Sequence, residues 1–201
     1  MSRHSRGAAL VVALLMLMVI LMLGIAASQS ALQGLKTTRN DGDRQVALQA
    51  AEAALRDAEM DIEQSPDAGK SRSSIFSRRS SLGFPAHGET GCNGGAANIY
   101  LGLCRQAGMN ALPVWQTVEF GEDAATVQTV AFGTFTGQSL QVGKGALPSR
   151  LPRYIIELFS YKRPGESADK VSYFYRITAV GFGARESTQV ALQSFYRKED
   201  E

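Results

Sequence analysis

The chain begins with a long apolar stretch, and residues 8–27 contain no Asp, Glu, Lys, Arg or His. About 20 apolar residues in a helix cross the roughly 30 Å hydrocarbon core of a bilayer. A secretory signal peptide has a shorter apolar region, typically about 7–15 residues, before a small-residue cleavage site such as residues 26–28 here. The length therefore favours a retained transmembrane helix over a discarded signal. Arg3 and Arg6 predict a cytoplasmic N-terminus, with the rest of the chain across the membrane.

An amphipathic helix is predicted after the apolar stretch. Its apolar face repeats every three or four residues, the period of an α-helix, in the series Leu48, Ala51, Leu55, Ala58 and Ile62. Good helix formers fill this region. Pro66 ends the helix, because the residue before a proline is driven out of the helical conformation. A helix continuous with the apolar stretch is expected to be weakest at Gly34 and Gly42.

Alternating apolar residues predict β-strands in the C-terminal part of the chain. Residues 153–161, 171–181 and 188–197 are rich in Tyr, Phe, Val and Ile with a period of two, and residues 125–137 predict one or two shorter strands. Turn-forming breaks between the long strands predict an antiparallel meander. The amphipathic helix is expected to cover one face of this sheet, because both apolar faces would otherwise contact water. The predicted fold class is therefore α+β, with the amphipathic half of a long N-terminal helix packed on an antiparallel sheet.

Between the helix and the strands, residues 66–115 lack periodicity and are typical of loops, with Trp115 expected in the core. The remaining length is sufficient for one domain with its own core. The predicted organisation is a polar leader over residues 1–7, a transmembrane helix over 8–28, an amphipathic extension over 29–64 and a globular β-sheet head over 65–201.

Charge is distributed unevenly, although the chain is nearly neutral with 21 basic and 19 acidic residues. Residues 41–63 hold seven acids against two arginines, and the chain from residue 64 onward holds 15 basic and 12 acidic residues. A solvated helix face is the simpler interpretation, and charge complementarity between the acidic helix and a basic head is the alternative. Arg72, Arg78 and Arg79 are likewise expected to be solvated loop charges rather than a basic patch. Near neutrality makes a nucleic-acid partner unexpected.

The two cysteines, Cys92 and Cys104, predict a disulfide. They lie in a glycine-rich segment on the side of the membrane where disulfides persist, and closing such a loop contributes roughly 3 kcal/mol. A metal site lacks ligands, since His4 and His87 are the only histidines. The same shortage leaves no nucleophile–His–acid set, and no phosphate or dinucleotide motif is complete. Neither an enzyme, nor a cofactor, nor a metal is expected.

The chain resembles a type IV prepilin in four features: a short basic leader ending in Gly, an apolar helix that starts at the next residue, an amphipathic extension and a sheet-bearing head. Four segments are similar to the PilX-type minor pilins: "RGAALVVALLMLMVILMLGIAA", "DRQVALQAAEAALRDAE", "GLC…PVW" and the tail "PRYIIEL…YRITAVGFGARESTQVALQSFYRK". The quoted segments do not cover residues 66–90 and 116–150. The resemblance implies that the prepilin peptidase cuts after Gly7 and methylates the amine of Ala8.

The resemblance also implies a minor pilin that primes type IV pilus assembly and supports twitching motility and adhesion. Its implied partners are other minor pilins, a large non-pilin tip adhesin, the major pilin, the inner-membrane assembly platform and the prepilin peptidase. Its implied location is the inner membrane before assembly, with a periplasmic head, and the pilus afterwards. A type II secretion pseudopilin and a single-pass envelope binding protein are the alternatives.

Val12 departs from the family pattern. Most pilins carry Glu as the fifth residue of the mature chain, where it is thought to meet the amine of the subunit ahead. A carboxylate inside hydrocarbon is costly without a partner, and a subunit with nothing ahead of it would not need one. Val12 therefore favours a position at or near the pilus tip, and tolerance of the loss in a scarce subunit is the alternative.

Overall fold

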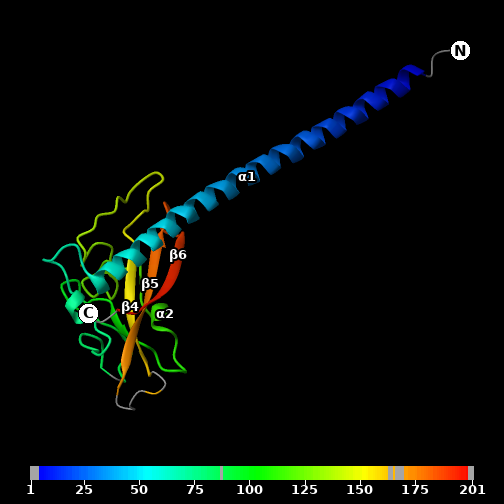
Figure 1. Ribbon diagram of the computed structural model, residues 1–201. Helices are drawn as coiled ribbons and strands as arrows, with labels where there is room; N and C mark the ends of the chain where they lie inside the picture. Colours follow the sequence, from blue (N-terminus) through cyan, green and yellow to red (C-terminus); the bar gives the residue numbers. More distant parts are fainter. Residues whose placement is uncertain (1–4, 87, 163–164, 166–169, 199–201) are drawn as a thin grey trace. The chain divides into compact units, whose positions relative to one another are not determined.

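The computed structural model describes the chain except for residues 1–4, 87, 163–164, 166–169 and 199–201. It divides into two compact units, Met1–Gly42 and Asp43–Glu201, each of which is described by itself. Helix α1, Ser5–Glu63, begins in the first unit and ends in the second. The other helices and strands of the described residues belong to the second unit (Figure 1).

The first unit consists of the apolar part of α1. Its large apolar side chains from Leu10 to Leu35 are between 50% and 69% exposed. The helix is long and apolar enough to cross a membrane, and none of its most apolar stretch is buried. It continues without interruption through Gly34 and Gly42, the two predicted weak points.

In the second unit, residues 43–63 of α1 lie against a sheet, as Figure 1 shows for the cyan part of the helix. The helix ends at Glu63, one residue before the predicted end. Ser65 then leaves the helical path before Pro66, as the steric demand of proline requires. The Ser65 hydroxyl donates a hydrogen bond of 2.7 Å to the Phe135 carbonyl, which fastens the helix end to the head.

Three long strands form the predicted antiparallel meander: β4 (Arg153–Tyr161), β5 (Ser172–Phe182) and β6 (Gln189–Tyr196). Their bounds agree with the predicted ranges to within one residue. Tyr154 lies opposite Ala179, and Ala179 lies opposite Leu192. This register puts Tyr154, Ala179 and Leu192 on the face that α1 covers, as the period of two predicts.

Three short strands complete the sheet and were not predicted in this form: β1 (Gly91–Cys92), β2 (Leu103–Arg105) and β3 (Val130–Ala131). The strand order is β1-β2-β4-β5-β6, with β3 also on β4, and β2 runs parallel to β4. Of residues 125–137, where one or two short strands are predicted, Val130 and Ala131 form a strand and the others do not. The chain turns at Gly133, whose φ of +79° suits glycine, so the alternating pattern cannot continue as a strand.

Each face of the sheet carries a hydrophobic cluster. The main cluster lies between α1 and the sheet and includes Ala54, Ala58, Ile62, Tyr154 and Ile177. The second lies on the opposite face, where the disulfide segment and the short helix α2 (Val114–Thr117) cover Ile155 and Val180. Trp115, expected in the core, is half-buried at the margin of this second cluster, and its neighbour Val114 is buried instead. A 3-10 turn, η1 (Ser73–Ile75), contributes Ile75 to the main cluster.

A disulfide joins Cys92 and Cys104, in agreement with the prediction. The two residues lie opposite each other on β1 and β2, with their Cα atoms 4.0 Å apart. Because β2 also pairs with β4, the bridge ties the loop-rich segment after η1 to the central sheet. Closing a loop of this length contributes roughly 3 kcal/mol in the chain-entropy model.

Candidate functional site

The expected processing position lies within α1. Gly7 and Ala8 are both helical, and Ala8 is exposed, whereas residues 1–4 of the expected leader lie outside the described residues. Val12 is 52% exposed on the same apolar helix. The first unit therefore presents an uncovered apolar surface from Ala8 onward.

The contact between α1 and the sheet uses a helix face displaced from the predicted one. Of the predicted residues, Ala51, Ala58 and Ile62 are buried, whereas Leu48 and Leu55 are half-buried at the side of the contact. The centre of the buried face is the series Ala47, Ala50, Ala54, Asp57 and Asp61. These residues also follow spacings of three and four, but their small or charged side chains carry no apolar signal. The prediction followed the leucines Leu48 and Leu55, whereas alanines and aspartates occupy the centre of the buried face.

Alanines occupy this face because the helix backbone lies directly on β5. A Cβ atom built on Gly181 would lie 2.1 Å from the Ala47 carbonyl oxygen and 2.3 Å from the Ala51 amide nitrogen. Gly183 is similarly restricted by Asp43. Larger residues at the alanine positions of α1 or at the glycine positions of the sheet would hold the helix away from β5. The small residues in the sequence therefore fit the close helix–strand contact in the structure.

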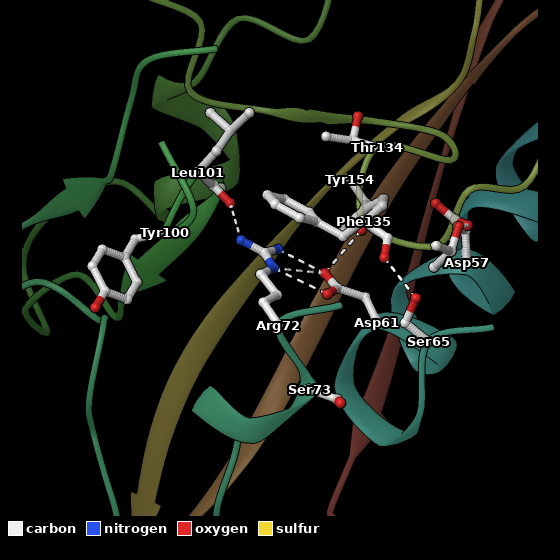
Figure 2. A network of polar contacts seen from close by, with 12 residues as sticks. Asp57, Asp61, Ser65, Arg72, Ser73, Tyr100, Leu101, Thr134, Phe135 and Tyr154 are labelled. Carbon is white, nitrogen blue, oxygen red and sulfur yellow. Dashed lines mark hydrogen bonds and ion pairs between the residues drawn. The ribbon is translucent and has the colours of Figure 1, made fainter. Parts of the chain in front are cut away.

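A fully buried ion pair fastens the last turn of α1 to the head (Figure 2). Arg72 Nε donates to the two carboxylate oxygens of Asp61 at 3.0 and 3.1 Å, and Arg72 Nη2 donates to Asp61 Oδ2 at 2.6 Å. The Tyr154 hydroxyl, from β4, donates to the same Oδ2 at 2.9 Å. Helix, loop and sheet thus meet at one carboxylate.

The remaining donors and the face of the Arg72 guanidinium are also occupied. Its Nη1 donates to the carbonyls of Ile99 and Leu101 at 2.9 and 2.7 Å, and its Cζ lies 3.6 Å from the centroid of the Phe135 ring. Burial raises the pKa of Tyr154 well above its ordinary value, so this hydroxyl remains a neutral donor. A buried charge costs several kcal/mol unless it is paired and hydrogen-bonded, and this one is both.

A second buried carboxylate, Asp57, lies one turn earlier on the same helix face. It accepts hydrogen bonds from the Gly133 amide at 2.8 Å and from the Thr136 hydroxyl. Burial raises the pKa of this carboxyl above its ordinary value, and the two hydrogen bonds oppose the rise. Asp57 therefore anchors the turn after β3 to α1.

A third contact lies at the start of the second unit. Asp43, which is 8% exposed, accepts hydrogen bonds from the Thr188 hydroxyl and from Arg185 Nε, the latter at 2.9 Å. The Thr188 hydrogen bond, followed by those of Arg185, holds the pKa of this carboxyl below its ordinary value despite burial. Asp43 thereby joins α1 to the turn between β5 and β6.

These three contacts correct the charge assignment made from the sequence. Asp43, Asp57 and Asp61 are buried, so this part of the acidic run is not a solvated helix face. Arg72 is 1% exposed, so it is not a solvated loop charge either, whereas Arg79 is exposed as expected. The alternative interpretation, charge complementarity between helix and head, holds within one subunit. Asp57 and Asp61 continue the helical spacing of Ala50 and Ala54. This spacing is the sequence signal that places the two aspartates on the buried helix face.

The arrangement holds the helix on the head and offers no reactive group. Every polar atom of the Asp61–Arg72–Tyr154 contact has a partner within the protein. Within the described part of the chain, no group of three or more His, Cys, Asp or Glu side chains could hold a metal ion. His4 and His87, the histidines considered from the sequence, lie outside the described residues.

Comparison with known families finds two matches that flank the middle of the chain. The family model "PilX N-terminal" matches residues 6–56, and the family model "Type IV pilus assembly protein PilX C-term" matches residues 100–198. The first match covers the apolar helix and most of its contact with the sheet, and the second covers β2 to β6. No curated protein and no solved structure matches the chain.

Proposed function

Because the chain belongs to the PilX family of type IV pilus minor pilins, we propose that it primes pilus assembly and remains at or near the pilus tip. One observation carries the proposal: helix α1 supplies both an exposed apolar surface and the buried contact with the sheet. The exposed part is long enough to anchor the subunit in the membrane and then to join other helices in a filament. Both parts lie within the matched N-terminal region.

The proposal includes processing and topology. The prepilin peptidase removes residues 1–7 by cutting between Gly7 and Ala8 and methylates Ala8. Before assembly the helix spans the inner membrane with its start in the cytoplasm and the head in the periplasm. Other minor pilins, the major pilin, a large non-pilin tip adhesin and the inner-membrane assembly platform are the proposed partners, and twitching motility and adhesion are the proposed outcomes.

The tip position rests on Val12. An internal subunit would gain from a carboxylate facing the amine of the subunit ahead, whereas a carboxylate inside hydrocarbon without a partner is costly. Val12 makes no such pair, so it is compatible with a subunit that has no pilin ahead of it.

We expect Val12→Glu to bring no increase in the number of surface pili, since no amine lies ahead for the new carboxylate to neutralise. Val12→Gln is the matched control, because glutamine has the size and polarity of glutamate without its charge. Pili are counted by electron microscopy, and the subunit is located by immunogold labelling, with gold expected at tips or in short assemblies at the cell surface. Gold spread along the shafts, or more pili with Val12→Glu than with Val12→Gln, would contradict the tip position and leave the pilin assignment intact.

A further inference from the structure

Strand β6, Gln189–Tyr196, forms one edge of the sheet. Across the described part of the chain, no strand pairs with its outer side, and the opposite edge is β1, which has only two residues. The amide of Gly183 donates to the carbonyl of Thr188 at 2.8 Å and so continues the β5–β6 ladder. Along an antiparallel ladder, hydrogen-bonded pairs alternate with pairs whose backbone N–H and C=O groups point away from the partner strand. Four residues of β6 are of this second kind with respect to β5. The backbone groups that face the open edge belong to Gln189, Ala191, Gln193 and Phe195.

This edge has none of the usual protection against pairing. Natural proteins protect sheet edges with charged side chains, proline, bulges or very short strands. The sequence of β6, "QVALQSFY", has no charge and no proline, and its register with β5 runs through eight pairs without a bulge. An unprotected edge of this length is therefore a surface prepared for another strand.

Next to the edge lies a group of aromatic side chains, which we call the aromatic shelf and define as the half-buried Phe159 and Phe174 and the exposed Phe195. Their ring centroids lie 5.4 to 6.5 Å apart, on the face of the sheet opposite α1. The disulfide segment and α2 cover the other end of that face, at Ile155, Val180 and Phe182. Phe195 is 66% exposed, and with Phe174 it lines a groove of about 470 Å³ at the end of β6. Edge and shelf are continuous, because Phe195 belongs to both.

We propose that the open edge of β6 binds an extended strand of another pilus polypeptide. The row of backbone donors and acceptors requires a β-strand, as in other proteins that bind a peptide by adding it to a sheet. The strand is uncharged where it pairs with β6, because β6 itself carries no charge. The guanidinium of Arg176, which lies 4.8 Å from the centroid of the Phe159 ring, already pairs with Glu157. Its side chains at alternate positions are apolar and lie on the aromatic shelf, where aromatic pairs contribute beyond simple burial.

A second copy of the same chain does not fit this edge in one membrane. Antiparallel pairing of two β6 strands places a twofold axis perpendicular to the joined sheet and reverses every direction within it. Residues 43–63 of α1 lie along that sheet, so the two copies would run their helices in opposite directions. Asp43, where the apolar segment joins the head, would therefore lie at opposite ends of the joined sheet in the two copies, which does not suit two heads anchored on one side of one bilayer. This step rests on the proposed function, because it assumes that the chain is anchored by α1.

The test uses the detergent-solubilised full chain and a fluorophore-labelled, uncharged peptide of alternating Thr and Phe as the strand probe. We expect saturable binding by fluorescence anisotropy that weakens about tenfold or more in Ala191→Pro, because proline removes an outward amide and crowds the edge. Ala191→Thr, which keeps the amide, is the control and should bind like the wild type. Phe195→Lys changes an exposed shelf residue without affecting the β5–β6 ladder and should also weaken binding.

Three outcomes would overturn the proposal: no binding, binding that Ala191→Pro and Phe195→Lys leave unchanged, or a wild-type homodimer by light scattering that Ala191→Pro dissociates. The last outcome would assign the edge to a second copy. Binding of the probe does not depend on leader removal or pilus formation. Absence of binding would therefore not contradict the proposed function, and absence of leader cleavage would not contradict strand binding.

Discussion

Replacing Arg72 with Met is expected to lower the free energy of unfolding by about 3–5 kcal/mol, because it leaves the Asp61 carboxylate buried without its cation. The carbonyls of Ile99 and Leu101 lose their donors at the same time. A loss of this size is a large fraction of the stability of an ordinary domain. Denaturant unfolding of the detergent-solubilised full chain, followed by Trp115 fluorescence, measures it.

Two further variants separate the ion pair from the surrounding packing. Arg79→Met removes an exposed arginine from the same segment and should change stability by no more than about 0.5 kcal/mol. Asp61→Leu combined with Arg72→Met removes both charges and should cost less than Arg72→Met alone, since no unpaired charge remains. Equal stability of the Arg72→Met and Arg79→Met variants would show that the ion pair contributes nothing to the folded head.

The second large effect is expected at the contact between α1 and β5. Gly181→Ala places a Cβ atom about 2 Å from the helix backbone at Ala47, and a backbone cannot rotate away as a side chain can. We expect a loss at the upper end of the range for overpacked cores, about 3 kcal/mol, with the helix displaced from the sheet. Because the subunit is proposed to join the pilus through α1, the number of surface pili should fall as well.

Gly108→Ala is the matched control for that substitution. Gly108 is exposed, and a Cβ atom there meets nothing within 4 Å. Its effect on unfolding should be small, and pili should form normally. If the Gly181→Ala variant unfolds at the same denaturant concentration as the wild type, the close helix–strand contact does not exist in the molecule.

The long elements could be predicted from the sequence because their periodicity persists over many residues. Strands β4, β5 and β6 repeat apolar residues every two positions, and residues 8–27 of α1 contain no charged side chain. Strands β1, β2 and β3 contain two or three residues each, too few to show a period. Their existence depends on the disulfide and on pairing with β4, which are tertiary contacts.

The polar contacts of α1 could not be predicted for a different reason. Arg72 lies in a segment rich in serine, arginine and glycine, and nothing in its neighbours distinguishes it from Arg79. Only the fold brings Arg72 to Asp61 and Tyr154. The displacement of the helix face has a similar origin, because the glycine that admits the alanines, Gly181, is more than a hundred residues away in the sequence.

The first helix is proposed to be cut from its leader and then retained, and the N-terminus of the mature chain tests this most directly. Mass spectrometry of the chain purified from membranes should find an N-terminal peptide that begins at Ala8 and carries one methyl group on its amine. The Gly7→Arg variant should remain full length, because the peptidase requires a small residue where the backbone enters its site. A wild-type chain that keeps residues 1–7 in the membrane, or a Gly7→Arg variant cut as efficiently as the wild type, would contradict the account.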